Sequence, residues 1–282
     1  MCKMRSELRI QTPVGELEVS VIGENVKPTA LLWHSLFVDS RSWHRVEDDL
    51  AEDRRLVIVT GPGHGDSADP GRRYTTNDCA DAAVTILDRL DVSQPVDWVG
   101  NAWGGHVGII VAARYPERCR TLVTVGTPVH AYTRAGRLRT ALLVLLYRLL
   151  GPRRFLVDAV TDVLLSEQTR AHDPAAVELV RDSFTRADRV GLVNAVTSIS
   201  LLRPDLTPLL PGVAAPTLFV TGTGHSDWSS DQATNASRML PHGSVEVLEG
   251  AAYLGPLETP GEFTRLLRNY WATHAPSESD LS

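Results

Sequence analysis

The stretch VGNAWGG, residues Val99–Gly105, is the starting point for assigning the fold of this chain. It follows an apolar run and precedes a helical pattern, so it predicts a sharp turn between a strand and a helix. Gly100 and Gly104 have the spacing of the G-x-S-x-G turn, in which the central residue is presented to a pocket above a sheet. Ala102 occupies the serine position. A methyl group cannot attack a substrate, so a covalent intermediate at this position is excluded.

Apolar runs typical of β-strands recur along the chain, with helical patterns between them. The runs span Leu17–Ile22, Thr29–Trp33, Leu56–Val59, Val96–Gly100, Thr121–Val125, Thr217–Gly222 and Ser244–Gly250. The helical patterns lie near Val46–Leu50, Thr76–Leu90, His106–Tyr115, Gln232–Leu240 and Pro260–Trp271. This alternation indicates an α/β fold with a mostly parallel sheet covered by helices on both faces, and the first run predicts an antiparallel edge.

One long segment interrupts the alternation of strands and helices. From residue 130 to residue 205 the pattern is nearly all helical. We therefore predict a core of residues 1–129 and 206–272, an inserted helical cap of residues 130–205, and a disordered tail of residues 273–282. The arginines of the insert could attract an anionic ligand or a membrane surface, although a solvated helix face is the more common reason for such a pattern.

Four further stretches accompany the turn. They are Leu31–Trp43 (LLWHSLFVDSRSW), Gly61–Ser67 (GPGHGDS), Gly104–Pro128 (GGHVGIIVAARYPERCRTLVTVGTP) and Gly250–Phe263 (GAAYLGPLETPGEF). Together they resemble the α/β-hydrolase fold superfamily over roughly residues 17–271. The tryptophan after the nucleophile position and the helical insert look most like its capped epoxide hydrolase, dehalogenase and carbon-carbon bond hydrolase branch. The resemblance implies a doubly covered parallel sheet with a cap, but fold alone does not fix the reaction.

The resemblance also implies a catalytic triad, and all three of its positions are changed here. Ala102 replaces the nucleophile, Tyr253 stands where the catalytic histidine is expected, and His225 stands at the acid position with Asp227 two residues later. An engineered serine-to-alanine substitution would explain only the first change, so the sequence favours a natural departure from the serine mechanism. We interpret Tyr253 and the His225–Asp227 pair as candidate proton carriers.

The backbone donors of such a site do not depend on the missing side chain. We expect the N–H groups of Leu36 and Trp103 to form an oxyanion hole, because that device depends on turn geometry. The candidate pocket residues are His34, Ser35, Asp39 and Trp228. The fold's usual use of His34 is structural, and Ser35 is the candidate for a displaced nucleophile.

Composition excludes several classes of function. The net charge of −6 argues against a nucleic-acid surface, and no apolar run approaches the roughly 20 residues of a membrane span. The polar N-terminus lacks a signal-peptide pattern, so we expect a cytoplasmic protein, and the three cysteines are expected to be reduced thiols. No cluster has metal-ligand spacing and no dinucleotide fingerprint is present, so we expect no metal and no cofactor.

Two classes of function remain in view, and a third is retained as a variant. The first is an enzyme that acts on a small apolar carbonyl compound by oxyanion stabilisation and proton transfer, through hydrolysis by activated water, elimination, cyclisation or carbon-carbon bond chemistry. The second is a catalytically inactive ligand-binding protein. The variant is a serine hydrolase that uses Ser35. The partner is a small molecule in each case, and a homodimer is left open.

Overall fold

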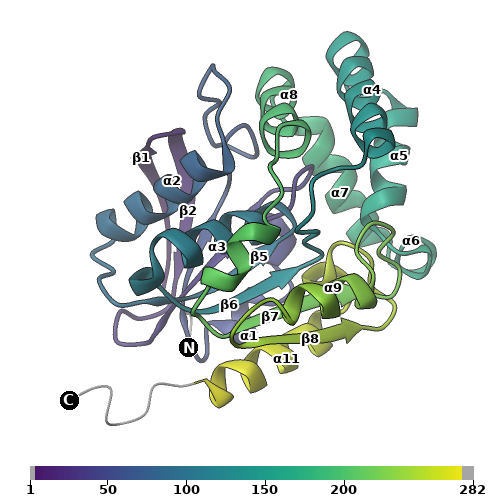
Figure 1. Ribbon diagram of the computed structural model, residues 1–282. Coiled ribbons are helices and arrows are strands. Elements are labelled where there is room, and N and C mark those ends of the chain that lie inside the picture. The colour runs from purple at the N-terminus through teal and green to yellow at the C-terminus, as the bar shows by residue number, and fades with distance from the viewer. Residues whose placement is uncertain (1–3, 275–282) are drawn as a thin grey trace.

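The computed structural model describes residues 4–274, and its centre is one eight-stranded sheet (Figure 1). The strands are ordered β1-β2-β4-β3-β5-β6-β7-β8. They span Arg5–Thr12 (β1), Gly15–Ile22 (β2), Thr29–Trp33 (β3), Arg55–Val59 (β4), Val96–Asn101 (β5), Cys119–Val125 (β6), Thr217–Gly222 (β7) and Gly243–Leu248 (β8). β2 pairs antiparallel with both β1 and β4, and the remaining pairs are parallel. The α/β class and the mostly parallel sheet are thus confirmed.

Helices cover both faces of this sheet (Figure 1). One face packs against α2 (Thr76–Arg89), α3 (Trp103–Arg114) and α9 (Ser230–Ser237). The other packs against the 3-10 helix η1 (Ser40–Trp43), α1 (Glu47–Leu50) and α11 (Pro260–Thr273), and the short α10 (Gly255–Glu258) precedes α11. The central strands β3 and β4 are buried along their whole length because both faces are covered.

The segment between β6 and β7 is helical in the structure. It contains α4 (Arg134–Leu150), α5 (Arg154–Leu164), α6 (Glu167–His172), α7 (Pro174–Arg186), α8 (Arg189–Val196), the π-helical turn η3 (Thr197–Leu201) and the 3-10 helix η4 (Thr207–Gly212). Its helices pack around a small hydrophobic core of their own that also includes Val38, Leu254 and Leu257. We refer to residues 130–205 as the inserted segment.

Charged groups tie the inserted segment to the sheet domain. Arg45 forms a bidentate ion pair with Asp173 and donates a hydrogen bond to the carbonyl oxygen of Leu257 at 2.9 Å. Arg41 pairs with Asp182 at 2.6 Å. Because these contacts join η1 and the following turn to α6 and α7, they fix the inserted segment beside the carboxyl ends of the strands.

The structure bears on the expectations for the C-terminal tail, the cysteines and membrane spans. The C-terminal helix α11 continues to Thr273, so the ordered chain extends past the start of the predicted tail, and residues 275–282 of that tail lie outside the described residues. Cys79 and Cys119 are free and buried, while Cys2 also lies outside the described residues. Within residues 4–274, no helix is both long and apolar enough to cross a bilayer.

Candidate functional site

The turn between β5 and α3 has the backbone geometry that the sequence predicts. Ala102 has φ 46° and ψ −97°, a strained conformation for a residue with a Cβ atom. A Cβ on Gly100 would lie 2.1 Å from the backbone of Gly104, and one on Gly104 would lie 2.0 Å from the carbonyl oxygen of Trp33. Glycine is therefore required on both sides of Ala102, whose methyl group is partly exposed.

The loop after β3 packs directly against the start of α3. The Gly104 N–H donates to the carbonyl oxygen of His34 at 3.2 Å. Within residues 4–274, neither the Leu36 N–H nor the Trp103 N–H donates to a protein acceptor. These are the two donors predicted for an oxyanion hole, and both lie on the segments that meet here. The Trp103 N–H is the first of α3, and a free N–H group at a helix start favours negative charge.

His34 is fixed by hydrogen bonds to the backbone. Its Nε2 accepts from the Gly61 N–H at 2.8 Å, and its Nδ1 donates to the carbonyl oxygen of Ser35 at 2.6 Å. Burial lowers the pKa of His34 to about 4, although the bond to Ser35 and the charge of Asp39 oppose the shift. His34 is thus neutral at pH 7 with both nitrogens engaged, and it is not free to activate the buried Ser35.

A second corner of the site lies next to Ala102. Asn101 Nδ2 donates to the carbonyl oxygens of Val125 and Tyr253, which joins the turn to the loop after β8. The Tyr253 ring stacks on the His225 ring with centroids 3.6 Å apart. The Tyr253 hydroxyl donates to Asp227 Oδ2 at 2.8 Å. The three predicted proton carriers therefore lie together.

The contacts among these three residues differ from a histidine–carboxylate side-chain pair. His225 Nδ1 accepts from the backbone N–H of Asp227 at 3.2 Å, and its Nε2 faces the carbonyl oxygen of Gly126 at 3.3 Å. Asp227 follows His225 by only two residues, so its N–H reaches the ring while its carboxylate bonds Tyr253. The sequence indicated neither contact.

Burial shifts the pKa values of His225 and Tyr253 in opposite directions. Burial lowers the pKa of His225 to about 4, so the ring is neutral at pH 7. Burial, together with the charge and hydrogen bond of Asp227, raises the pKa of Tyr253 far above its ordinary value. The Tyr253 hydroxyl therefore keeps its proton and donates a hydrogen bond to Asp227, whose carboxylate is exposed to solvent.

Two other predicted pocket residues are occupied by structural contacts. Asp39 is buried, caps η1 through the Arg41 N–H at 3.0 Å, and pairs with the Arg41 guanidinium. Burial alone would raise the pKa of Asp39, but its bonds to Arg41 lower it overall. Trp228 is fully buried against Phe219 and His130. Neither side chain presents an open surface here.

Sequence reasoning missed Arg203, a buried cation near this corner. Only 6% of the residue is exposed. Its guanidinium donates to His106 Nε2 at 2.8 Å and to the carbonyl oxygen of His130 at 2.7 Å, and it lies 5.0 Å from the centre of the Tyr132 ring. No carboxylate among residues 4–274 forms an ion pair with it. Burial lowers the pKa of Arg203, while the nearby groups that oppose the shift include Tyr253 and Asp227.

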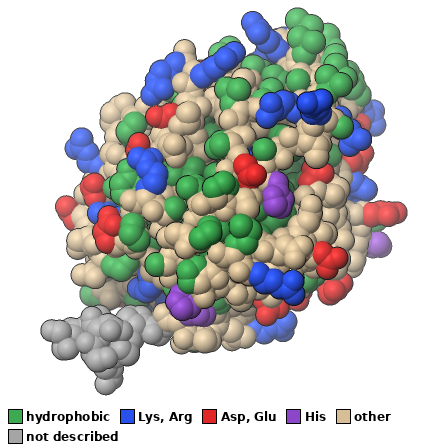
Figure 2. Space-filling view, viewed as in Figure 1, with side chains coloured by type: hydrophobic (Ala, Val, Ile, Leu, Met, Phe, Trp, Pro, Cys, Tyr) green, Lys and Arg blue, Asp and Glu red, His purple; other side chains and the backbone are tan. Residues whose placement is uncertain are grey.

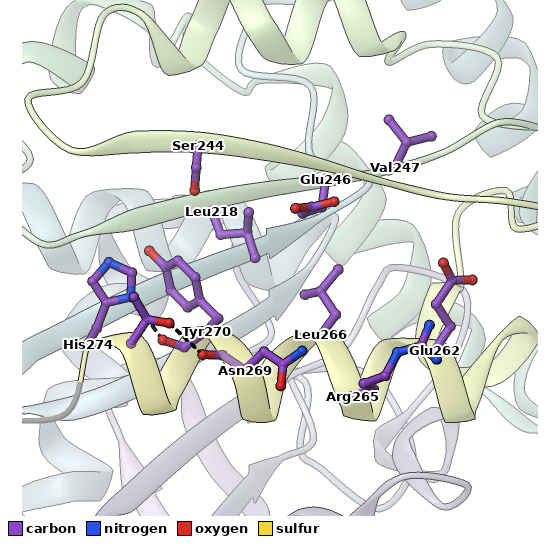
Figure 3. A pocket seen from close by; sticks show the side chains of 11 residues that line it. Leu218, Ser244, Glu246, Val247, Glu262, Arg265, Leu266, Asn269, Tyr270 and His274 are labelled. Atoms are coloured by element: carbon purple, nitrogen blue, oxygen red, sulfur yellow. Dashed lines mark hydrogen bonds between the residues drawn. The ribbon is translucent and has the colours of Figure 1, made fainter.

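A separate cavity of about 390 Å³ lies along the edge of the sheet (Figure 3). It runs between the edge strand β8 and helix α11 and is lined by residues such as Ser244, Glu246, Leu266 and Tyr270. None of the residues around Ala102 lines it. This groove is therefore distinct from the candidate site at the carboxyl ends of the strands. Among the described residues, no group of three or more potential metal ligands could hold a metal ion.

The geometry of the strained turn and the order of the strands agree with comparisons to known proteins. A family model described as "alpha/beta hydrolase fold" matches residues 28–148, the part that contains the turn. The enol-lactonase from Burkholderia xenovorans LB400 superposes with a TM-score of 0.85 at 22% identity, covering 94% of this chain and 100% of that one. The chain therefore has the α/β-hydrolase fold, and its residues 28–148 match the model of that family.

Two curated relatives extend the likeness. The putative 2-succinyl-6-hydroxy-2,4-cyclohexadiene-1-carboxylate synthase of Bacillus subtilis is 24% identical over 255 residues, which cover 88% of this chain and 92% of that protein. The 2-hydroxymuconate semialdehyde hydrolase of Pseudomonas sp. (strain CF600) is 38% identical over 87 residues, about 30% of each chain. The relatives of this chain thus include proteins named as enzymes.

Proposed function

We propose that this α/β-hydrolase-fold protein is an enzyme that acts on a small carbonyl compound without a covalent intermediate. The methyl group of Ala102 supplies no nucleophile. The N–H groups of Leu36 and Trp103 would bind the carbonyl oxygen, and they are positioned by the backbone rather than by a triad. Removal of a triad in one well-studied protease leaves about 10³ to 10⁴-fold catalysis from such donors and binding.

Asp227 is the base in this proposal. Its exposed carboxylate would take a proton from the carbon next to the carbonyl group, or from a water molecule. The electron pair left on carbon would form an enolate, whose oxygen the two N–H groups stabilise. Elimination, cyclisation or carbon-carbon bond formation could follow from the enolate. The activated water would instead add to the carbonyl carbon and give hydrolysis, including cleavage of a carbon-carbon bond with an enolate as the leaving group.

Tyr253 would orient Asp227 rather than exchange its own proton. Its hydroxyl remains protonated because its pKa is raised, and it holds Oδ2 of Asp227 at 2.8 Å. The other carboxylate oxygen stays available to a substrate. His225 would support the tyrosine ring by stacking, and Arg203 would favour substrates or intermediates with negative charge.

The observation that carries this proposal is the Tyr253–Asp227 hydrogen bond. Asn101 joins the Tyr253 backbone to the turn at Ala102. The names of the relatives are consistent with it. One is a synthase of a cyclohexadiene carboxylate, and the other is a hydrolase of a semialdehyde. Both names describe small oxygenated carbon compounds.

The inserted segment would act as a lid in the same proposal. Its ion pairs through Arg45 and Arg41 hold it over the sheet domain, and the Tyr253 N–H donates to the carbonyl oxygen of Leu164 at 3.3 Å. A lid at this place would exclude water from the enolate and select substrates. We therefore propose that residues 1–129 and 206–272 form the core and that residues 130–205 form its cap.

Proton exchange provides a test that needs no knowledge of the natural substrate. Incorporation of deuterium from D₂O into the carbon next to the aldehyde group of succinic semialdehyde would be followed by NMR with and without the protein. We expect Asp227→Asn to lower the exchange rate at least about tenfold, because general-base catalysis typically contributes about 10²-fold or more. Asp231→Asn, an exposed carboxylate on α9, is the matched control. Equal rates for Asp227→Asn and the wild type would refute the assignment.

A ligand-binding protein without turnover is the second candidate. The observations that favour it are the engagement of both His225 nitrogens and the strongly held proton of Tyr253. Under this alternative, calorimetry would detect a ligand whose affinity survives Asp227→Asn, and neither protein would accelerate exchange. A serine hydrolase based on Ser35 would instead be labelled by a fluorophosphonate, and the label would be lost in Ser35→Ala.

A further inference from the structure

Helix α4 presents an apolar face to solvent. Leu138, Leu142, Leu145 and Leu149 are 72%, 54%, 51% and 65% exposed. At about 100° per residue, their spacing of four, three and four places them within an arc of about 60°. Tyr147, on the opposite face, is buried against the other helices of the inserted segment. The outward leucines are therefore not needed for packing within this chain.

Arginines border this leucine face on both sides. By the same helical spacing, Arg137 and Arg148 lie along one border and Arg139 along the other. Arg153 and Arg154 follow the helix, next to Phe155, which is 54% exposed. Residues 118–157 contain no aspartate or glutamate, although the whole chain carries a net charge of −6. Figure 2 shows apolar and basic side chains gathered in the region of α4.

This combination points to one kind of partner. A second copy of the same face would bring arginines against arginines, which is unfavourable. The helix lies at the outer edge of the molecule (Figure 1), and its residues do not line the groove between β8 and α11, whereas peptides and helices dock into grooves. An apolar face flanked by cations is the pattern of helices that lie in a membrane interface.

We propose that α4 binds the surface of a bilayer that contains anionic lipid. The helix lies in the plane of the membrane, its leucines enter the boundary between headgroups and acyl chains, and its arginines contact lipid phosphates. It does not span the bilayer. This inference goes beyond the proposed function and does not depend on it, since no residue of the candidate site takes part.

Vesicle binding tests the proposal directly. The purified full-length protein would be sedimented with vesicles of phosphatidylcholine alone and with vesicles of equal parts phosphatidylglycerol and phosphatidylcholine. We expect binding to the anionic vesicles that weakens with added salt. Arg137→Gln with Arg148→Gln should weaken this binding at least about tenfold, because each arginine near an anionic surface contributes to partitioning.

A second variant tests insertion of the leucines. Leu142→Ser with Leu145→Ser should also lose binding at least about tenfold, while its melting temperature stays close to that of the wild type because both side chains are exposed. Val26→Ser and Arg265→Gln, at exposed positions away from α4, are the matched controls and should bind as the wild type does.

Three results would overturn the proposal. The first is that the wild type fails to bind anionic vesicles. The second is a failure of specificity or of insertion: the wild type binds both kinds of vesicle equally, or the leucine variant binds as tightly as the wild type. The third is a wild-type dimer on size exclusion that the leucine variant abolishes without any vesicle binding, which would identify the face as an interface between copies.

Discussion

His34→Gln tests whether the first histidine of the loop after β3 is structural. In the folded protein its ring accepts from the Gly61 N–H and donates to the Ser35 carbonyl oxygen. A protonated ring cannot accept from Gly61, and it would carry a buried charge. Glutamine can offer one acceptor and one donor in place of the ring, but it does not titrate.

The magnitude follows from the shift in the pKa of His34, from an ordinary value of 6.5 to about 4. Because the folded-state value is lowered, the unfolded chain binds more protons between these two values, and stability falls as the pH decreases through this window. Linkage gives a loss of about 2 kcal/mol from His34 between about pH 7 and about pH 5. The same loss is absent from the glutamine variant.

Urea unfolding at both pH values, followed by tryptophan fluorescence, measures the effect. The difference in free energy of unfolding between wild type and His34→Gln should change by about 2 kcal/mol in the direction that favours the variant at the lower pH. His44→Gln, at an exposed histidine, is the matched control. A difference between wild type and His34→Gln that does not change with pH would show that the ring is not buried and neutral as described.

Three further predictions concern the turn at Ala102, the buried carboxylate of Asp97 and the three triad positions. Gly104→Ala should cost more than about 4 kcal/mol or prevent folding, measured as soluble yield and urea midpoint, whereas Gly261→Ala, which meets no atom within 4 Å, should change stability by less than about 1 kcal/mol. Asp97→Asn should lower the free energy of unfolding by about 3 kcal/mol, because the buried carboxylate pairs with two arginines; retained stability would show that these pairs are dispensable. The triple variant A102S/H225D/Y253H restores a serine, an acid and a histidine at the three triad positions. A fluorophosphonate should label it at least about a thousandfold faster than A102S, whose labelling should be negligible. Equal rates would contradict the geometry inferred for these three positions.

Much of the sheet was predictable because its strands are continuous apolar runs. Thr29–Trp33 and Thr217–Gly222 match β3 and β7 residue for residue, and the other predicted runs agree within two residues at each end. β1, Arg5–Thr12, was missed because it is an edge strand whose first five residues are exposed, so burial left no apolar pattern in its sequence. The predicted antiparallel edge is confirmed at β2.

The site was predictable where backbone geometry dictates the residue, and less so where side chains meet across the fold. The glycines around Ala102 follow from steric contact, so their spacing indicated the turn. Local sequence could not show that the carboxylate of Asp227 bonds Tyr253 while its N–H bonds His225, because that choice depends on two loops meeting. Arg203 left only a weak signal, a lone cation in the stretch SISLLRPDL.

The strained backbone at Ala102 has a consequence for how this protein could change over time. Conformations of this kind cost of order 1–3 kcal/mol, and here the cost persists although no reactive atom is presented. The main chain thus preserves the conformation that would present a reactive side chain at position 102, although the side chain is now a methyl group. New chemistry at this position would require replacement of side chains only, with no rebuilding of the scaffold beneath them.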